Sequence, residues 1–261
     1  MISPSYAQFH RFQILVGENA LEKLSKTRVL LLGVGGVGSW CAEALIRNGI
    51  GRLDIVDSDA VCVTNVNRQL QALHSTVGQS KVDVLADRLR DIHPGATINA
   101  INAVYNQDSA NQFDLTAYDY VVDAIDSLSS KVELIDRALR TEVTLFSSMG
   151  ASCKMDPTLI RVDSFWKTFG CPLAKFVRKR LRNRNVTKDF VCVFSPENLP
   201  AHPSNIACGS GNCVCPALQD GTPAHEWCSS KKQINGSSVH ITGMYGFYLA
   251  ALVTNNAIKL H

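Results

Sequence analysis

A glycine-rich turn between an aliphatic run and a helical pattern restricts the fold of this chain more than any other feature. Residues 28–34 are mostly aliphatic, as in a strand buried on both faces of a parallel sheet. Apolar residues then recur at helical spacing over residues 40–48. Between the two patterns lie Gly33, Gly35, Gly36 and Gly38. Glycines in this context allow a tight turn and let backbone N–H groups approach a phosphate at the start of the helix. The sequence therefore predicts a nucleotide-binding strand–turn–helix unit.

Strand and helix patterns continue to alternate through the first 150 residues. We expect strands at residues 52–56, 97–104, 118–125 and 143–147, and helices at residues 82–92 and 130–140. Such alternation is typical of an α/β fold with a Rossmann-like, doubly wound, mainly parallel sheet.

The sequence after Gly150 changes in character. We expect strands at residues 158–162 and 191–194 on either side of a basic helix, and an irregular extension over residues 196–238, which lack periodicity. A closing helix over residues 239–260 would pack closely on the sheet or on a second subunit through Gly243 and Gly246. We interpret residues 1–261 as one domain, with a nucleotide-binding half (1–150) and a half for substrate binding and dimerisation (151–261).

The composition favours an intracellular globular protein. The chain has 261 residues, of which 46% are hydrophobic, enough for one substantial core. It contains neither a signal-peptide pattern nor an apolar run of the roughly 18 residues that a membrane span needs. Its nine cysteines are odd in number and scattered, which argues against a secreted disulfide framework. We expect a cytoplasmic protein with reduced, mostly buried cysteines and no membrane partner.

Charged residues near the glycines indicate which nucleotide binds. Asp57 follows Gly38 by 19 residues, at the end of a predicted strand, where a carboxylate can accept hydrogen bonds from ribose hydroxyls. Glycines and Asp57 alone leave NAD and other nucleotides open. Arg68 and Lys81, however, have little use at the ribose edge of a dinucleotide. A triphosphate needs such cations, because displacement at the α-phosphorus builds up negative charge that they stabilise.

A basic run follows in the second half of the chain. Between its first and last lysines there is no acidic residue; its members are Lys175, Arg178, Lys179, Arg180, Arg182, Arg184 and Lys188. A solvated helix face is the alternative, but the absence of balancing acids favours contact with a nucleic acid.

Four cysteines in the irregular extension are spaced C-x4-C-x-C-x12-C; they are Cys208, Cys213, Cys215 and Cys228. One intervening residue is too few for a standard zinc knuckle, so we expect buried or loop thiols, with zinc as the alternative. A docking site for a sulfur-transfer or redox partner in this extension also stays open.

The spaced motifs together resemble the adenylating enzymes of the ubiquitin-activating superfamily, of the ThiF and MoeB type. The matching strings, over about residues 9 to 150, are GVGGVGS, DSD, VTNVNRQ, GQSK and VVDAIDS. This resemblance implies that Asp57 and Asp59 lie at the nucleotide and that Asn65, Arg68 and Lys81 contact the phosphates. It also implies that Asp126 positions Mg²⁺ and ATP; a strand-capping role is the alternative for its neighbour Asp123.

The resemblance further implies that Arg11 enters the ATP site of a neighbouring subunit, which would make the protein a homodimer. Gln8 departs from the pattern, because the superfamily has a second arginine there. The physical obstacle in such a reaction is the approach of two anions, a carboxylate and ATP. That obstacle would be removed by positive charges, namely magnesium, Arg11, Arg68 and Lys81. The reaction needs no general base, because the carboxylate is already ionised.

The second half resembles the dehydratase family that acts on threonylcarbamoyladenosine in tRNA. The carrying strings are GA at 150–151, DPT at 156–158, IRV at 160–162, KT at 167–168, PLA at 172–174, VRKRLR at 177–182 and VCVFS at 191–195. That family activates the threonine carboxylate with ATP and closes a ring through the carbamoyl nitrogen, and the basic helix fits a tRNA partner. Ser152, Cys153 and Cys171 depart from the family pattern.

Two other functions stay open at this point. The first is an activating enzyme for a ubiquitin-like sulfur carrier, which would share the ATP site. The second is an NAD-dependent oxidoreductase or a non-catalytic nucleotide-binding module. The basic helix and the absence of paired C-x-x-C motifs favour the tRNA enzyme over the first, and Arg68, Lys81 and Asp126 disfavour the second.

Overall fold

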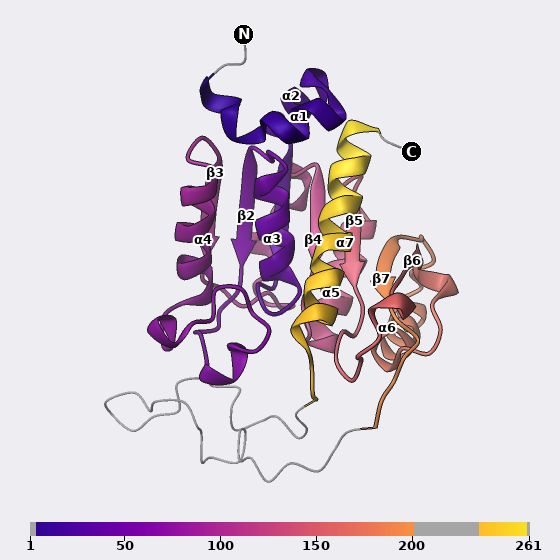
Figure 1. Cartoon of the computed structure of the whole chain (residues 1–261). Helices are drawn as coiled ribbons and strands as arrows, with labels where there is room; N and C mark the ends of the chain where they lie inside the picture. Colours follow the sequence, from indigo (N-terminus) through magenta and orange to yellow (C-terminus); the bar gives the residue numbers. More distant parts are fainter. Residues whose placement is uncertain (1–3, 201–234, 260–261) are drawn as a thin grey trace.

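The computed structural model describes residues 4–200 and 235–259 and confirms the expected α/β class (Figure 1). One seven-stranded sheet has the order β3-β2-β1-β4-β5-β7-β6. Its strands are β1 (Arg28–Leu32), β2 (Arg52–Val56), β3 (Thr97–Ile101), β4 (Tyr120–Asp123), β5 (Thr144–Ser148), β6 (Arg161–Ser164) and β7 (Val191–Phe194). All neighbouring strands are parallel except β6 and β7, which are antiparallel. The sheet therefore runs without a break from the nucleotide-binding half into the second half.

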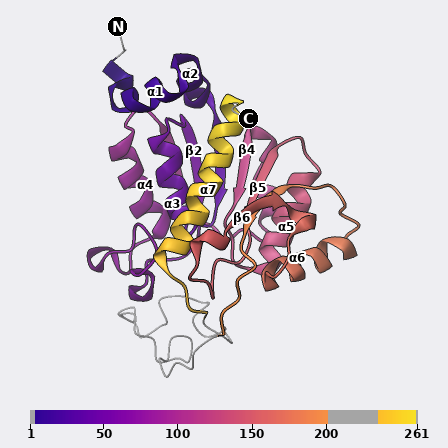
Figure 2. The ribbon, with the colours of Figure 1, turned by 45° about the vertical axis from the view of Figure 1, so that its right-hand side comes forward.

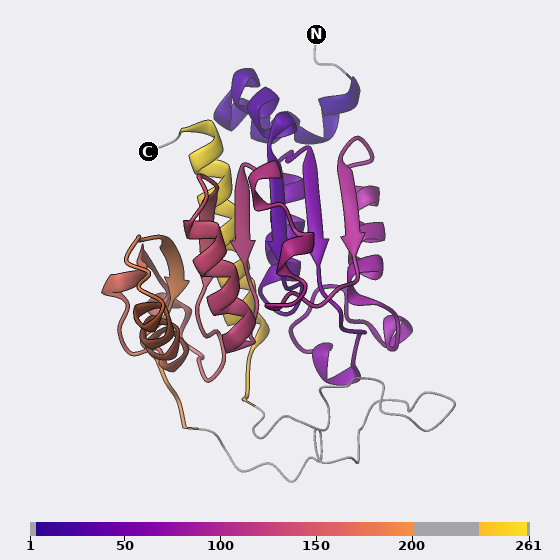
Figure 3. The same cartoon turned by 180° about the vertical axis from the view of Figure 1, so that it is seen from behind.

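Helices cover both faces of this sheet. The α-helices are α1 (His10–Val16), α2 (Glu18–Lys26), α3 (Gly38–Arg47), α4 (Lys81–Ile92), α5 (Leu128–Leu139), α6 (Pro172–Asn183) and α7 (Val239–Ile258). Short 3-10 helices are η1 (Pro4–Phe9), η2 (Val63–Asn65), η3 (His74–Thr76), η4 (Ala110–Gln112), η5 (Leu115–Ala117), η6 (Pro157–Leu159) and η7 (Phe165–Lys167). Helices α3, α4 and α7 lie on one face, and α5 and α6 on the other (Figures 1 and 3).

Strand β1 shows why the aliphatic run is required. Leu31 belongs to the core under α3, α4 and α7, whereas Leu30 and Leu32 belong to the core under α5 and α6. Because successive side chains of a strand point to opposite faces, a strand covered on both sides must be apolar at every position.

The closing helix packs against α3 rather than standing apart. A Cβ atom on Gly246 would lie 2.5 Å from the carbonyl oxygen of Val37 and 2.8 Å from the backbone nitrogen of Cys41. Gly246 thus lets α7 approach α3 more closely than any side chain would allow. The expectation of close packing is met at this one of the two glycines named in the sequence analysis.

The predicted boundaries were wrong at three strands, and one of these is the strand expected at 97–104, which ends at Ile101. The strand expected at 158–162 is instead a 3-10 turn followed by β6, because Pro157 starts the turn and the Asp156 carboxylate accepts a hydrogen bond from the backbone N–H of Thr158. The strand expected at 118–125 ends at Asp123, whose carboxylate accepts from the backbone N–H of Ile125. Asp126 therefore lies in the loop beyond the strand rather than at its end.

The cysteines and the helices can also be compared with what the composition predicted. The five described cysteines are free, and four of them are buried, namely Cys41, Cys62, Cys171 and Cys192. The four cysteines of the C-x4-C-x-C-x12-C pattern lie outside the described residues. Among the helices that the structure describes, none combines the length and the apolar character needed to cross a membrane.

Candidate functional site

The glycine turn lies at the carboxyl edge of the sheet, where β1 and β4 are neighbours although the chain leaves them in opposite directions. Such a switch point is where α/β sheets bind ligands. Gly33 has φ 88°, and a Cβ atom on it would lie 2.7 Å from the carbonyl oxygen of Ala124. A Cβ atom on Gly38 would lie 1.8 Å from the carbonyl oxygen of Gly33. Both positions therefore admit only glycine. Because no side chain intervenes, the turn lies close to the β4–α5 loop, and α3 begins at this turn.

Asp57 follows β2 directly and fixes the shape of the turn. Its Oδ2 accepts a hydrogen bond from the backbone N–H of Val34 at 2.8 Å, and its Oδ1 accepts from that of Asp59 at 2.9 Å. Burial raises the pKa of this carboxyl group, an effect that the nearby Lys81 ammonium opposes. Because an ionised carboxylate has about four acceptor positions, Asp57 keeps capacity for ribose hydroxyls.

Lys81 forms an ion pair that the sequence did not predict. Its side chain is 6% exposed, and Nζ lies 2.7 Å from Oδ2 of Asp59, at the start of α4. The backbone supports the pair, because the N–H of Lys81 donates to the carbonyl oxygen of Asp59. The structure therefore brings two predicted site residues together and holds a buried ammonium beside Asp57.

Arg68 lies against the glycine turn on its other side. Its Cγ is 3.3 Å from the position a Cβ would take on Gly36, and its Nη1 donates to the carbonyl oxygen of Thr64 at 2.8 Å and to Oδ1 of Asn67 at 2.9 Å. Asn65 is buried in the same turn, where its Oδ1 accepts from the backbone N–H of Cys62. Arg68 thus lies against the glycine turn, and Lys81 lies near Asp57, whose carboxylate accepts a hydrogen bond from the same turn.

Two carboxylates at the end of β4 have separate environments. Asp123 and Lys131 are both fully buried, with Oδ2 and Nζ 2.7 Å apart, and the hydroxyl of Ser147 donates to the same oxygen at 2.6 Å. Asp126 is exposed in the loop that follows. Asp123 is therefore a structural anchor between β4, β5 and α5, whereas Asp126 is the accessible carboxylate of the two.

Three residues of this edge were not identified from the sequence. The Gln71 side-chain amide donates to the carbonyl oxygen of Val34 at 2.7 Å and braces the glycine turn. Within the described residues, Oε1 of buried Gln69 has no hydrogen-bond partner. Lys154 is buried near the end of β5, its ammonium donates to the carbonyl oxygen of Glu197, and burial lowers its pKa. Gln69 stands in the VTNVNRQ string, but that string assigned it no role, and isolated Gln71 and Lys154 carry no spacing signal that could have revealed them.

The flanks of residues 201–234 lie beside this site. The backbone N–H of Cys153 donates to the carbonyl oxygen of Gly236, and the N–H of Leu199 donates to that of Cys153. The side-chain amide of Asn67 donates to the carbonyl oxygen of Ser237 at 2.9 Å. The described residues on either side of 201–234 therefore lie at the nucleotide edge.

Arg11 lies at the opposite edge of the same chain. Helix α1 covers the amino ends of the strands together with α2, whereas the glycine turn follows their carboxyl ends (Figures 1 and 2). Arg11 cannot reach the glycine turn of its own chain. Ile14 and Leu15 on the same helix are 75% and 78% exposed, which leaves apolar surface next to Arg11.

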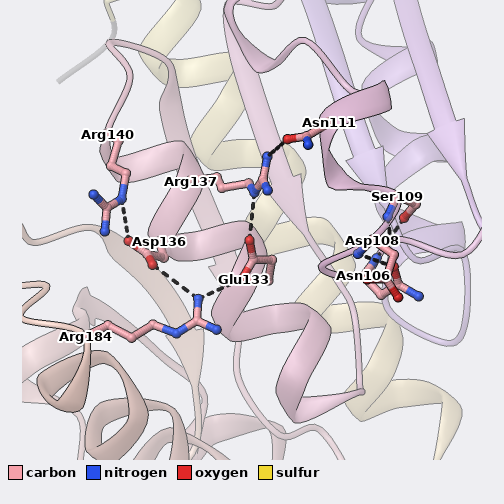
Figure 4. A network of polar contacts seen from close by, with 9 residues as sticks. All are labelled: Asn106, Asp108, Ser109, Asn111, Glu133, Asp136, Arg137, Arg140 and Arg184. Carbon is pink, nitrogen blue, oxygen red and sulfur yellow. Dashed lines mark hydrogen bonds and ion pairs between the residues drawn. The ribbon is translucent and has the colours of Figure 1, made fainter.

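Helix α6 and the residue that follows it contain two kinds of cation. Arg178 donates to the carbonyl oxygen of Thr168 at 2.6 Å, and Arg184 pairs with Glu133 at 2.8 Å and Asp136 at 3.2 Å on α5 (Figure 4). These two residues hold the helix in place. Four further cations of the helix are exposed and form none of the ion pairs between described residues; they are Lys175, Lys179, Arg180 and Arg182. Arg182 lies over the ring of Trp166, and we call the other three, Lys175, Lys179 and Arg180, the basic face of α6. Two acids of α5 thus neutralise Arg184, one member of the basic run at 175–188, which contains no acidic residue itself.

The fold and this site define a Rossmann-like nucleotide-binding protein with cations around its glycine turn, and the chain belongs to the ThiF family, whose model matches residues 7–260. Within that family it belongs with the tRNA threonylcarbamoyladenosine dehydratases. It is 44% identical to that dehydratase of Bacillus subtilis over 191 residues, which are 73% of this chain and 75% of that protein. It is 38% identical to the Escherichia coli enzyme over 240 residues, 89% of this chain and 87% of that protein.

Solved structures extend this similarity to the whole fold. The E. coli dehydratase crystallised with ATP has a TM-score of 0.82 and 32% identity to this chain, and the match covers 99% of this chain and 97% of that one. The molybdopterin-synthase adenylyltransferase of Salmonella typhimurium is 34% identical, but over only 135 residues, 52% of this chain and 53% of that protein.

Proposed function

We propose that this chain is an ATP-dependent enzyme that converts threonylcarbamoyladenosine in tRNA to its cyclic form. One oxygen of the threonine carboxylate attacks the α-phosphorus of ATP, and pyrophosphate leaves. The carbamoyl nitrogen then attacks the activated acyl carbon and loses its proton, and AMP leaves with the former carboxylate oxygen. The nucleoside loses one water in total.

One observation carries this proposal over the alternative of a sulfur-carrier activator. Similarity to the dehydratases continues through the second half and α6, whereas similarity to the molybdopterin-synthase adenylyltransferase covers about half of each chain. The nucleotide-binding half is common to both classes, so the second half decides the substrate. An NAD-dependent oxidoreductase is disfavoured, because Arg68 lies against the turn, Lys81 lies near Asp57, and the dehydratase relative was crystallised with ATP.

Each residue of the nucleotide edge has a role in this proposal. The N–H groups of the glycine turn and the N-terminus of α3 bind phosphate, and Asp57 binds the ribose. Arg68 and Lys81 stabilise the charge that builds up as the carboxylate approaches ATP and pyrophosphate leaves. Asn65 fixes the turn that carries Arg68, and Asp59 holds the Lys81 ammonium in place.

A magnesium ion fits the carboxylate of Asp126. Mg²⁺ in nucleotide sites is usually held by one or two carboxylates together with phosphate oxygens and water, and Asp126 is an exposed carboxylate at this edge. When bound, Mg²⁺ would neutralise charge on the phosphates. Asp123 is unsuited to this role because Lys131 and Ser147 already occupy its Oδ2.

The proposed enzyme is a homodimer in which Arg11 of one subunit completes the ATP site of the other. Two features support this arrangement. Arg11 lies at the wrong edge to serve its own chain, and the exposed Ile14 and Leu15 provide apolar surface for an interface on the same helix.

The tRNA contacts would centre on α6. Phosphate neutralisation dominates affinity for nucleic acids, and the basic face supplies three exposed cations. We assign Arg178 and Arg184 to holding the helix, because both donate to groups of the protein.

Mass spectrometry of tRNA nucleosides tests the function directly. The enzyme is incubated with ATP, Mg²⁺ and tRNA that contains threonylcarbamoyladenosine, and the nucleosides are then separated. We expect the threonylcarbamoyl nucleoside to lose one water only when ATP is present. An unchanged nucleoside, combined with ATP turnover on a ubiquitin-like carrier protein, would contradict the proposal and support the alternative.

A further inference from the structure

A hollow of about 320 Å³ lies at the C-terminal end of α6, away from the nucleotide edge. It is lined by Trp166, Arg182, Asn185, Val186 and Thr187. Val186 is buried, whereas Arg182, Asn185 and Thr187 are exposed and Trp166 is half-buried. The hollow is thus open to solvent and has aromatic, cationic and amide groups around an apolar side chain.

Trp166 is held in place around its ring. Its indole N–H donates to the carbonyl oxygen of Lys188 at 3.4 Å, and the ring of Phe165 meets it edge-on with centroids 5.3 Å apart. The guanidinium carbon of Arg182 lies 5.6 Å from the centre of the indole ring, over its face. An indole and a guanidinium therefore lie together at the surface, and both present planar groups on which an aromatic ring can stack.

The two neighbouring arginines of this region differ in one respect. Arg184 pairs with Glu133 and Asp136, whereas Arg182 forms none of the ion pairs seen among residues 4–200 and 235–259. The two acids of α5 balance the charge of Arg184. No acid among the described residues balances the charge of Arg182. A ligand that both stacks and carries negative charge would use this pair of groups.

Asn185 supplies hydrogen-bonding capacity at the rim of the hollow. It has φ 57°, the left-handed conformation that asparagine tolerates better than most residues, and its backbone N–H donates to the carbonyl oxygen of Arg182. Its side-chain amide combines two donors with an acceptor, which suits the edge of a nucleobase.

We propose that this hollow binds one unpaired nucleobase of the RNA substrate, stacked on Trp166 and Arg182. The proposal deepens the proposed function and rests on it for the identity of the RNA. RNA-binding proteins commonly stack unpaired bases on aromatic side chains and guanidinium planes, and the basic face of α6 lies on the same helix to neutralise the neighbouring phosphates.

The base in this hollow is not the one that reacts. Helix α6 starts beside Gly150 at the nucleotide edge, where a Cβ on Gly150 would lie 3.5 Å from Cys171 Sγ. From Pro172 to Arg182, which lines the hollow, the helix rises by about 15 Å, at about 1.5 Å per residue. The hollow therefore reads a nucleotide some distance along the RNA from the modified nucleoside, and it adds selectivity for the RNA rather than chemistry.

Binding of a stem-loop RNA that contains threonylcarbamoyladenosine to full-length protein tests the proposal. We expect Trp166→Ala to weaken binding by about 5-fold to 150-fold, the range found when one base loses its aromatic stacking partner. The dependence of binding on salt should stay as in wild type, because the same phosphates are still neutralised. Phe176→Ala is the matched control: this ring is on the same helix, 54% exposed and outside the hollow, and its removal should leave affinity unchanged.

Abasic RNAs then identify the base. Each loop nucleotide is replaced in turn by an abasic one, and each RNA is measured against wild type and Trp166→Ala. At one position the two decreases in affinity should fail to add, because both changes remove the same stacking interaction. Arg182→Gln, at an exposed side chain, repeats the test if Trp166→Ala does not fold, and it should show its largest effect at the same position.

Wild-type affinity in the folded Trp166 variant, or decreases that add at every abasic position, would overturn the proposal. An equal decrease in Phe176→Ala would also do so. The proposed function is judged separately, by whether the wild-type enzyme removes water from the nucleoside. If the wild-type enzyme dehydrates the nucleoside and Trp166→Ala binds RNA like wild type, the nucleobase site is refuted and the proposed function is not.

Discussion

The two carboxylates after β4 provide the sharpest test of the site. Asp123→Asn removes the charge that balances Lys131, whose side chain is 0% exposed. Removal of one partner of a buried ion pair costs about 3–5 kcal/mol, because the other charge stays buried without a counterion. For a chain of this length 1 kcal/mol corresponds to about 2–4 °C in melting temperature, so the Tm should fall by about 6–20 °C.

Asp126→Asn should behave in the opposite way. Asp126 is exposed, so its substitution should change the free energy of unfolding by no more than about 0.5 kcal/mol. Adenylation should nevertheless fall by about 100-fold or more, because the variant lacks the group that we assign to magnesium. Urea unfolding followed by circular dichroism measures the first quantity, and pyrophosphate release with ATP, Mg²⁺ and tRNA measures the second.

The double variant Asp123→Asn/Lys131→Met serves as the control. It removes both charges, and we expect it to be less destabilised than the sum of the single variants by about 1–3 kcal/mol. The reasoning is refuted if Asp123→Asn keeps its stability and loses adenylation, or if Asp126→Asn is fully active. The first result would assign the functional role to Asp123, and the second would remove it from Asp126.

Three other predictions concern the cations and one buried histidine. Arg68→Ala and Lys81→Ala should each slow adenylation by about 100-fold to 1,000-fold, as expected when a preorganised group that stabilises developing charge is removed, and circular dichroism should still show a folded protein; pyrophosphate release near wild type in both would count against the triphosphate site. Replacement of the basic face of α6 by alanines should weaken tRNA binding. It should also reduce the slope of log affinity against log salt by about 0.7–0.9 for each phosphate that is no longer neutralised, and an unchanged slope would exclude this face from the interface. Burial lowers the pKa of His93 below the ordinary 6.5. As the pH falls, the unfolded chain therefore binds the proton before the folded protein does. The free energy of unfolding should decrease for this reason between about pH 7 and about pH 5. Urea unfolding at several pH values should show a flatter slope for His93→Gln than for wild type, whereas the same change at exposed His74 should leave the slope unaltered.

The fold was largely predictable because its signals are local. An apolar run bounded by glycine predicted β1, helical spacing predicted α3, α4 and α5, and their alternation predicted a doubly wound sheet. The errors arose at ends of strands, where a single side-chain hydrogen bond decides the boundary. Asp156 and Asp123 each accept a backbone N–H two residues later, and periodicity contains no information about such turns.

The composition of the nucleotide edge was also predictable, but its internal pairing was not. Glycines, Asp57, Arg68 and Lys81 are residue types that phosphate and ribose demand, and the sequence places them after strands that end at one edge. The pairing of Lys81 with Asp59 spans 22 residues, and Gln71 reaches Val34 across 37 residues. Distances of this kind depend on how the turns fold back.

The sequence by itself determined that this chain forms a parallel nucleotide-binding sheet, because hydrophobic period and glycine placement act between near neighbours. Only the tertiary structure decided which charges are available to ligands. It buried Asp123 against Lys131, joined Arg184 to the acids of α5, left Arg182 on the ring of Trp166, and placed Arg11 at the edge opposite the glycine turn. The availability of a charge depends on the groups that surround it in space, and residues far apart in the chain supply those groups.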